Sequence, residues 1–442
     1  RKTNKSFKNN NMPFGFYIIM AAQFFSSLAD NALLIAAISL LLQLFAPEWM
    51  TPMLKFVFTV SYVLFAAVVG AFADSMPKGR VMFITNTIKV LGCLIIFTHD
   101  WWSISGVEDY LTILLGYAVV GLGAAAYSPA KYGILTEYLP HHKLVIANGW
   151  IEGLTVGSII LGTLLGGALV SEAISDKLLA IPLPHFLDQI DTPGEAAIGV
   201  IVVLYVIAAI FNLYIPNTGV DHKMVNRNPM YLIREFSHCM KLLWSDKLGQ
   251  ISLAITTLFW GAGATLQFIV LKWAEVALGY DLSRATYLQG VCAAGVTVGA
   301  VMAAKMVPLN RAVNVIPMGI LMGIIVMLMI VVPNVYFAVP LIILIGALSG
   351  YFVVPMNALL QHRGHILMGA GHSIAVQNFN ENVSILIMIG LYALLISMDV
   401  SIYIVIGLFG AFISGSMYLV RKRHLYNLTQ GPLPAIPTGA IH

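Results

Sequence analysis

The chain has 442 residues, of which 59% are hydrophobic and only 10% are charged. Soluble globular proteins carry roughly 25% charged residues, so this composition excludes a water-soluble enzyme. The formal net charge of +4 is too small to indicate a nucleic-acid partner, and none is expected. Because one helical crossing of a bilayer needs roughly 20 apolar residues, the length predicts about a dozen membrane helices with short loops.

Charge-poor windows predict where these helices lie, because an uncompensated charge is costly in hydrocarbon. The uncharged stretch between Arg311 and Arg363 is too long for one helix, and Pro333 with Asn334 divides it into two. In chain order, the twelve expected helices cover residues 14–46, 53–73, 81–99, 110–138, 144–174, 195–215, 249–279, 284–306, 312–332, 335–361, 369–398 and 400–420.

Lysine and arginine residues concentrate in alternate loops and so predict the orientation. One side holds the basic N-terminal tail, Lys143, the 216–248 loop and the 421–423 segment, whereas the other side is mostly acidic. By the positive-inside rule, both termini are expected in the cytoplasm. We expect a cytoplasmic tail at residues 1–13, an N-terminal bundle at 14–215, a cytoplasmic inter-bundle loop at 216–248, a C-terminal bundle at 249–420 and a cytoplasmic tail at 421–442.

An internal repeat indicates that the two halves are related. Gly70 and Gly299 are 229 residues apart, and so are Glu152 and Glu381. The prolines of SPAKYGIL and VPMNALL are separated by a similar 226 residues. Two six-helix halves with an internal repeat are typical of major facilitator transporters. The predicted fold is therefore an all-α polytopic membrane protein, with twelve transmembrane helices in two pseudo-symmetric six-helix bundles.

The loop after the second expected helix reads GAFADSMPKGR and resembles the major facilitator signature at this position. Gly70 permits close helix approach, and Asp74 can accept from a helix N-terminus or from an arginine across a cytoplasmic gate. Gly70, Asp74 and Arg80 are therefore the expected gating residues. The second half has Ala303 at the aspartate position, so only one half carries the signature. An ordinary charged loop is the alternative interpretation.

Asp30 and Asn31 stand in the middle of the apolar segment QFFSSLADNALL. Counted from Tyr17, Asp30 is about 20 Å deep in the membrane, near its midplane. A carboxylate there has to face a cavity, pair with a cation or be protonated. The cavity-facing interpretation makes Asp30 and Asn31 candidate substrate contacts.

Lys131 lies about 10 Å from the cytoplasmic end of the fourth expected helix, next to the helix-loosening Pro129. Glu152 on the fifth helix has a similar depth, so it is the easier partner for Lys131, while Asp30 is about 10 Å higher. A Lys131 to Glu152 pair that only joins two helices is the structural alternative to substrate binding.

The eleventh expected helix carries an amide-rich patch around Asn378 and Glu381. Such groups either bond between helices or line a wet path, and the depth of Glu381, about 18 Å, favours a cavity. Lys89, roughly two turns into the third helix, is expected to be structural or to snorkel. Three glycine pairs predict close helix packing: Gly153 with Gly157, Gly162 with Gly166, and Gly295 with Gly299.

No motif for chemical catalysis is present in the sequence. It contains no Walker A sequence, no G-x-S-x-G and no H-x-E metal motif, so neither an enzyme nor a cofactor nor a metal site is expected. The three cysteines lie far apart and support neither a disulfide framework nor a zinc site.

Several segments together resemble the bacterial lysophospholipid transporter family. They are AAQFFSSLADNALL, FADSMPKGRVMF, GAAAYSPAKYGIL, ANGWIEG, LFWGAGATLQF, YFVVPMNALLQHRG and AVQNFNEN, and they occur in the expected order between about residues 20 and 420. The resemblance places Asp30, Asn31 and Lys131 on a polar substrate pathway, with Glu152 and Glu381 as further members. The family has an arginine where this chain has Gln267, so the headgroup phosphate has to rely on Lys131 or on another cation.

The resemblance implies facilitated movement of 2-acyl-glycerophosphoethanolamine and related lysolipids from the outer to the inner leaflet of the bacterial inner membrane. It further implies alternating access with lateral entry from the bilayer. A cytoplasmic acyltransferase/acyl-carrier-protein synthetase, fused to the carrier in some bacteria, would then rebuild the diacyl lipid. A monomer is expected. The headgroup phosphate would meet Lys131, while Asp30 or Glu152 attracts the ammonium.

Two other classes of function remain open at this stage. A proton-coupled exporter of drugs or metabolites would use Asp30 or Glu381 as its titrating carboxyl. A membrane scaffold or receptor that moves no substrate would use the same polar groups for packing only. Headgroup preference, ion coupling, conformational state and the partner of Lys131 are not determined by the sequence.

Overall fold

The computed structural model describes residues 12–102, 108–139, 144–188, 190–219, 228–368 and 370–436. Within these ranges the chain forms helices and no strands. The first half contains α1 (Phe14–Gln43), α2 (Met50–Leu64), α3 (Ala66–Asp74), α4 (Lys78–Phe97), η1 (His99–Trp101), α5 (Asp109–Tyr138), α6 (Leu144–Val170), α7 (Glu172–Leu179), η4 (His185–Leu187) and α8 (Pro193–Leu213).

The second half begins with α9 (Pro229–Ser245), which is followed by α10 (Gly249–Leu278), α11 (Leu282–Met306), η5 (Leu309–Val315), α12 (Ile316–Met327), η6 (Leu328–Val331), α13 (Val335–Met368), α14 (Ala370–Ser397) and α15 (Ile402–Thr429). Eleven segments of the described chain are long and apolar enough to cross a membrane, and α2 is a shorter apolar helix that α3 continues. The twelve predicted crossings are therefore present, and the fold class is confirmed.

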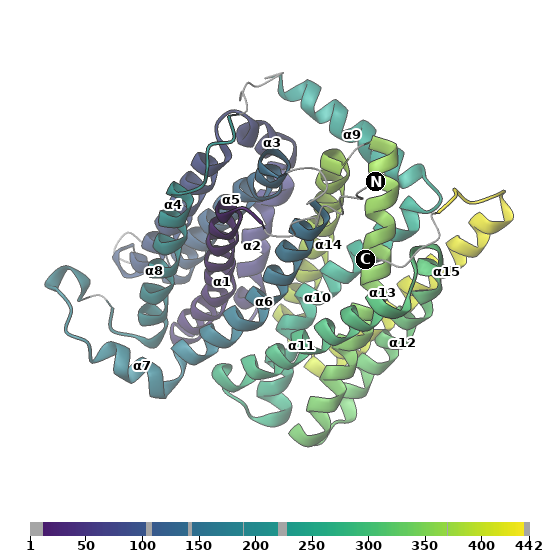
Figure 1. The fold of residues 1–442 in the computed structure, drawn as a ribbon. Coiled ribbons are helices and arrows are strands. Elements are labelled where there is room, and N and C mark those ends of the chain that lie inside the picture. Colours follow the sequence, from purple (N-terminus) through teal and green to yellow (C-terminus); the bar gives the residue numbers. More distant parts are fainter. Residues whose placement is uncertain are drawn as a thin grey trace, which may run out of the picture.

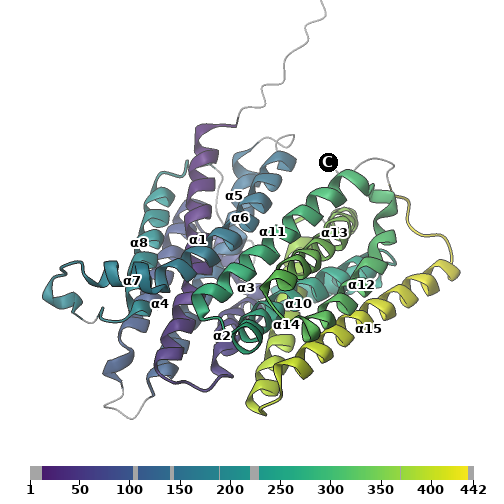
Figure 2. The ribbon, with the colours of Figure 1, turned by 90° about the horizontal axis from the view of Figure 1, so that it is seen from below.

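The helices form two bundles that lie side by side, α1–α8 and α10–α15 (Figure 1). In the first bundle α1 packs between α6 and α8, and in the second α10 packs against α14 and α15. The bundles also contact each other in a reciprocal manner, because α6 meets α11 and α14 meets α2 (Figure 2). Corresponding helices of the two halves thus play corresponding roles, as expected for a pseudo-symmetric pair.

Glycines bring α1 and α6 into close contact. A Cβ atom at Gly162 would lie 2.8 Å from the Leu28 carbonyl oxygen, and one at Gly166 would lie 2.9 Å from that of Ala32. The two glycines therefore pack helices, as predicted. Gly295 and Gly299 likewise face the backbone of α13, whereas nothing lies within 4 Å of a Cβ at Gly153 or Gly157. The prediction of close helix packing is thus wrong for Gly153 and Gly157.

Contacts between the bundles gather at one membrane side. We call the side on which α1 begins the near side and the opposite side the far side. On the far side, Ser283 of α11 donates to the Gly167 carbonyl of α6 at 2.9 Å. Lys272 of α10 pairs there with Glu48, which precedes α2, at 2.7 Å. The far side is therefore closed by direct contacts.

The observed helices differ from the expected ones mainly where a short amphipathic helix replaces a loop. Two such helices, α7 and α9, were expected as loop or as the end of a longer span. Charge-poor windows miss α9, because only one face of it is apolar and buries Cys239 and Leu243. The second crossing contains Lys55, breaks at Phe65 and continues as α3. Finally, α15 continues to Thr429, beyond the expected end at residue 420.

Candidate functional site

A buried ion pair joins two helices near the middle of the first bundle. Lys89 of α4 donates to Asp30 of α1, with 2.9 Å between Nζ and Oδ2. The Lys89 side chain is only 1% exposed, whereas that of Asp30 is 22% exposed. Of the three alternatives for Asp30, namely a cavity, a cation or a proton, the structure shows the cation. The expectation that Lys89 might snorkel is wrong, and its structural interpretation stands, because the ammonium points into the bundle and not to the membrane surface.

Hydrogen bonds from three helices complete this polar network. The Tyr205 hydroxyl of α8 donates to Oδ1 of Asp30 at 2.5 Å. Lys89 also donates to the Ser26 hydroxyl at 3.0 Å, and Ser26 donates to Asn86 at 2.7 Å. Both Asp30 oxygens and the ammonium are therefore bonded, which offsets part of the cost of removing two charges from water. We call Ser26, Asp30, Asn86, Lys89 and Tyr205 the central network.

Three buried polar atoms of the first bundle, one of them in the central network, have no hydrogen-bond partner among the described residues. These are Gln23 Oε1, Asn86 Nδ2 and the Tyr127 hydroxyl. The Lys89 ammonium lies 5.1 Å from the centre of the Tyr127 ring, so Tyr127 contacts the same site. Buried polar atoms are normally satisfied. A cluster of unsatisfied donors and acceptors next to a partly exposed carboxylate is thus suited to a polar ligand or to water.

A second lysine, Lys55 of α2, belongs to this region. Its ammonium lies 5.0 Å from the centre of the Phe58 ring, and it interacts electrostatically with Asp30. The first bundle therefore has a further intramembrane cation on a helix that contacts the second bundle through α14. Lys55 is not evident from the sequence, because its single charge lies inside the otherwise apolar window of residues 53–73.

The Asn31 side chain lies at the contact between α1 and α6, and the cavity-facing position expected for it is not observed. Its side chain donates to the Ser27 carbonyl at 2.8 Å, and its Cβ lies opposite Gly162 of α6. Asn31 therefore contributes to the packing of α1 against α6 in this conformation. Its role as a substrate contact stays a prediction.

Lys131 and Glu152 are placed on neighbouring elements of the first bundle. Lys131 lies on α5, two residues after Pro129, is partly buried and interacts with its surroundings. Glu152 lies on α6, but its side chain is outside the described part of the chain. Asp30 bonds to Lys89 and Tyr205, so the cation beside it is Lys89, and the pairing of Lys131 with Glu152 stays a prediction.

The second bundle holds a corresponding polar cluster on α13 and α14. Gln377 donates to Glu381 at 2.9 Å and to Asn357 at 2.7 Å, and Glu381 is 8% exposed. Asn378 lies on the same helix and is partly buried, with its carbonyl accepting from Asn382. Asn357 was missed by sequence analysis, although it stands two residues after Pro355, as Lys131 stands two residues after Pro129. This equal spacing from a proline in the two halves was the signal in the sequence that could have identified Asn357.

Gln267 of α10 lies near the bundle interface but shows only a backbone contact. Its carbonyl accepts from Gln289 of α11 at 2.7 Å, and its side chain is partly buried. No contact joins Gln267 to Asp30 or Glu381 among the interactions of the described residues. Its part in substrate binding stays a prediction.

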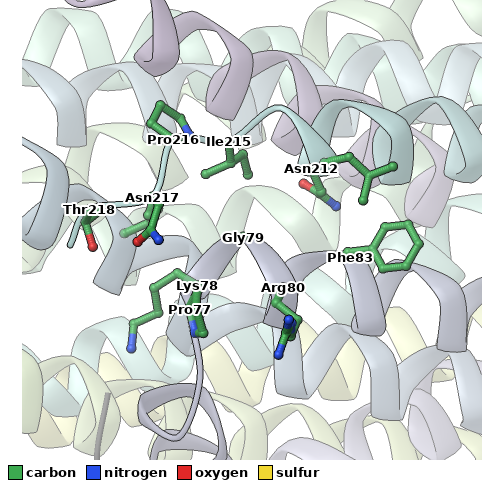
Figure 3. Close-up of a pocket in the computed structure, with 12 residues that line it drawn as sticks. Pro77, Lys78, Gly79, Arg80, Phe83, Asn212, Ile215, Pro216, Asn217 and Thr218 are labelled. Atoms are coloured by element: carbon green, nitrogen blue, oxygen red, sulfur yellow. The ribbon is translucent and has the colours of Figure 1, made fainter. Parts of the chain in front are cut away.

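The signature loop lies on the near side, beside a cavity of about 420 Å³ between the start of α4 and the end of α8 (Figure 3). Arg80 lines this cavity and is exposed, while the side chain of Lys78 is buried and donates to the Ala73 carbonyl at 2.9 Å. Lys78 also lies 3.4 Å from Glu137 at the end of α5. The side chains of Gly70 and Asp74 are outside the described part of the chain.

Two related helical bundles, a reciprocal interface and a buried polar cluster in each bundle are typical of transporters built from repeats. The model of the Major Facilitator Superfamily matches residues 19–387. The chain is 41% identical over 381 residues, 86% of each chain, to the lysophospholipid transporter LplT of Yersinia pestis and equally to that of Yersinia pseudotuberculosis. The chain therefore belongs to the Major Facilitator Superfamily, a family of transporters and not of enzymes.

Solved structures support the same fold. A bacterial homologue of the human lysosomal transporter Spinster, in an inward-facing and unoccupied conformation, has a TM-score of 0.66 at 13% identity, covering 94% of this chain and 99% of the other. The nucleoside transporter NupG has a TM-score of 0.67 at 11% identity, covering 93% and 99%. At such low identity these likenesses concern the fold alone.

Proposed function

We propose that the protein carries lysophospholipids across the bacterial inner membrane, from the outer to the inner leaflet, by alternating access. The main support is the 41% identity to lysophospholipid transporters over 86% of the chain. The preferred substrate is 2-acyl-glycerophosphoethanolamine, which a cytoplasmic acyltransferase reacylates. Both termini lie in the cytoplasm, the near side is cytoplasmic, and the monomer is the working unit.

The proposal assigns the observed conformation to the inward-facing state. Contacts that close the far side, between Ser283 and Gly167 and between Lys272 and Glu48, support this assignment. A lysolipid would enter from the outer leaflet when these contacts open, and it would leave on the near side in the present arrangement. Its apolar tail needs no polar partner and stays against apolar helix faces.

The two charges of the substrate fit two different parts of the first bundle. The headgroup phosphate binds Lys131, which is partly buried on α5 two residues after Pro129. The repeat supports this position, because the equivalent Asn357 contacts a residue of α14 in the second bundle. The ethanolamine ammonium binds near Asp30, the one carboxylate of the central network, which keeps 22% exposure.

The central network changes the role first expected for Asp30. Lys89 and Tyr205 already occupy one oxygen each, so an incoming ammonium adds to these bonds or displaces Lys89. Displacement would leave the buried ammonium of Lys89 without its carboxylate, so Lys89 and the substrate compete for Asp30. The Asp30–Lys89 pair thus carries no net charge without substrate, and displacement of Lys89 by the substrate would separate its two charges.

A leaflet-resolved flipping assay with labelled lysophosphatidylethanolamine in reconstituted vesicles tests the function. Protein-dependent flipping that persists when the proton gradient is collapsed is expected. No flipping would overturn the proposal, and strict dependence on the gradient would favour a proton-coupled exporter. Lys131→Ala should abolish flipping and Lys131→Arg should retain part of it, while Lys305→Ala, at an exposed near-side position, serves as the matched control.

A further inference from the structure

Four titratable side chains meet on the far side of the first bundle, away from the central network. His99 of η1 follows the end of α4, Asp100 is the next residue, and Asp109 begins α5. Glu195 lies in the first turn of α8. His99 and Glu195 are 3% and 2% exposed, so the histidine and one carboxylate are fully enclosed where three elements join.

Both ring nitrogens of His99 face carboxylate oxygens. Nε2 lies 3.3 Å from Glu195 Oε1 and forms a hydrogen bond with it. Nδ1 lies 2.8 Å from Asp100 Oδ1 and 3.8 Å from Asp109 Oδ2. In spite of the short separation, Nδ1 is a buried atom without a hydrogen-bond partner among the described residues. Proximity to two carboxylates therefore does not satisfy this nitrogen.

The Glu195 contact determines the tautomer of a neutral His99. A carboxylate can only accept, so Nε2 carries the proton and Nδ1 carries a lone pair. That lone pair then points at two negatively charged groups, which is unfavourable unless a cation lies between them. Histidines that bind metals commonly donate their other N–H to a carboxylate, which orients the ring and raises its basicity. Glu195 has this geometry.

We propose that His99 Nδ1, Asp100 and Asp109 bind a divalent transition-metal ion of the Zn²⁺ type, with Glu195 as the positioning residue. The three ligand atoms lie within 4.8 Å of one another. Ligand distances of about 2.0–2.2 Å to a tetrahedral Zn²⁺ require only a small outward movement of Asp100. Asp100 is 62% exposed, and water would occupy the fourth position.

The bound ion would join η1 directly to the start of α5, and it would join α8 to them through Glu195. His99 follows α4, Asp109 begins α5 and Glu195 belongs to α8, so the ion would stabilise the far end of the first bundle. The far side is the external side in the proposed orientation, where a metal ion has access without crossing the membrane. Sequence spacing could not reveal Glu195 as the positioning residue, because it is 96 residues from His99.

Zn²⁺ titration of chelator-treated protein, purified in detergent at pH 8, tests the proposal. We expect one Zn²⁺ ion per chain by isothermal titration calorimetry and a concentration-dependent rise in Tm, because a ligand that binds only the folded state stabilises it. His99→Gln and Asp109→Asn should abolish both effects. Glu195→Gln should retain the ligands and weaken binding by roughly 10–100-fold, the range found for lost positioning partners.

Two further variants keep the test decisive. His185 and Asp188 form another His–Asp pair on the far side, at 3.1 Å, but both are exposed. His185→Gln should therefore leave the Zn²⁺ response unchanged. If His99→Gln fails to fold, the exposed Asp100→Asn replaces it and should weaken binding. Absence of saturable binding, or binding that survives these substitutions, would mean that a second proton on His99 occupies the cluster instead, and would overturn the proposal.

Discussion

Lys89 on α4 and Asp30 on α1 form an ion pair of 2.9 Å at mid-membrane depth. The ammonium also donates to Ser26, one helical turn before Asp30, so it fixes the rotation of α1 relative to α4. Any movement that frees Asp30 for a substrate has to break or stretch this contact. The pair therefore couples helix packing to the polar part of the proposed pathway.

Removal of the lysine alone should destabilise the protein. Lys89→Met leaves the Asp30 carboxylate without its cation, and broken buried pairs cost about 3–5 kcal/mol. We expect about 3 kcal/mol or less here, because Asp30 is 22% exposed and keeps some hydration. The measurement is the free energy of unfolding in detergent micelles.

The double variant Asp30→Asn with Lys89→Met provides the control. Because it removes both charges, it should be more stable than Lys89→Met alone. Additive effects of the two substitutions would show that the ion pair does not contribute to stability. Flipping by the stable double variant would further show that Asp30 is not required for transport.

We predict that replacing tyrosine by phenylalanine lowers the stability of the protein at position 205 but not at position 127. Tyr205→Phe removes a hydrogen bond to a carboxylate, and such bonds contribute about 1.5–3 kcal/mol. Tyr127→Phe removes a buried hydroxyl that has no partner among the described residues, so stability should stay equal or rise. Thermal unfolding of both variants measures the difference, and equal losses would refute the central network as described.

The central network could be predicted only in part from the sequence. A single carboxylate in an apolar helix makes Asp30 conspicuous, and its depth requires a cavity, a cation or a proton, of which the structure shows the cation. Its partner could not be identified, because Lys89 reaches Asp30 only through the relative rotation of α1 and α4. Tyr205 is a further 175 residues along the chain from Asp30 and carries no charge to attract notice.

The fold was more accessible to prediction than the site. Apolar windows and the internal repeat predicted the twelve crossings, because membrane insertion imposes length and polarity on each segment. The same criterion treats α9 as a loop, since one polar face lowers its average hydropathy. It also concealed Lys55, whose single charge does not interrupt the apolar pattern of α2.

The glycines of α6 offer a direct test of helix packing. Gly162→Ala should destabilise by about 1–3 kcal/mol, because its Cβ would lie 2.8 Å from the Leu28 carbonyl and only 2.7 Å from the Asn31 Cβ. Gly157→Ala is the matched control on the same helix, where nothing lies within 4 Å. It should be neutral or stabilising, since alanine is favoured over glycine in helices by about 0.5–1 kcal/mol. A neutral effect at Gly162 would contradict the close approach of α1 and α6.

The near side should respond to acid through Asp246, which precedes α10. Burial alone raises the pKa of its carboxyl, but the Arg363 guanidinium and the backbone N–H groups of Gly249 and Leu248 outweigh burial and hold the pKa below its usual value. Arg363 bonds both oxygens, at 2.9 and 2.7 Å. A lowered folded-state pKa contributes stability above the unfolded value, about 3.9, and this stability is lost as the pH falls below it.

Asp246→Asn should therefore lower Tm at pH 7 and make Tm less sensitive to pH between about 5 and 3. The substitution removes the charge that Arg363 requires, and the buried guanidinium then lacks a counter-ion at every pH. Asp188→Asn, at an exposed far-side position, controls for the loss of a carboxylate in general and should change neither quantity. If Asp246→Asn matched the wild type at pH 7 and fell with it on acidification, the near-side bridge between Asp246 and α13 would not be the acid-sensitive element.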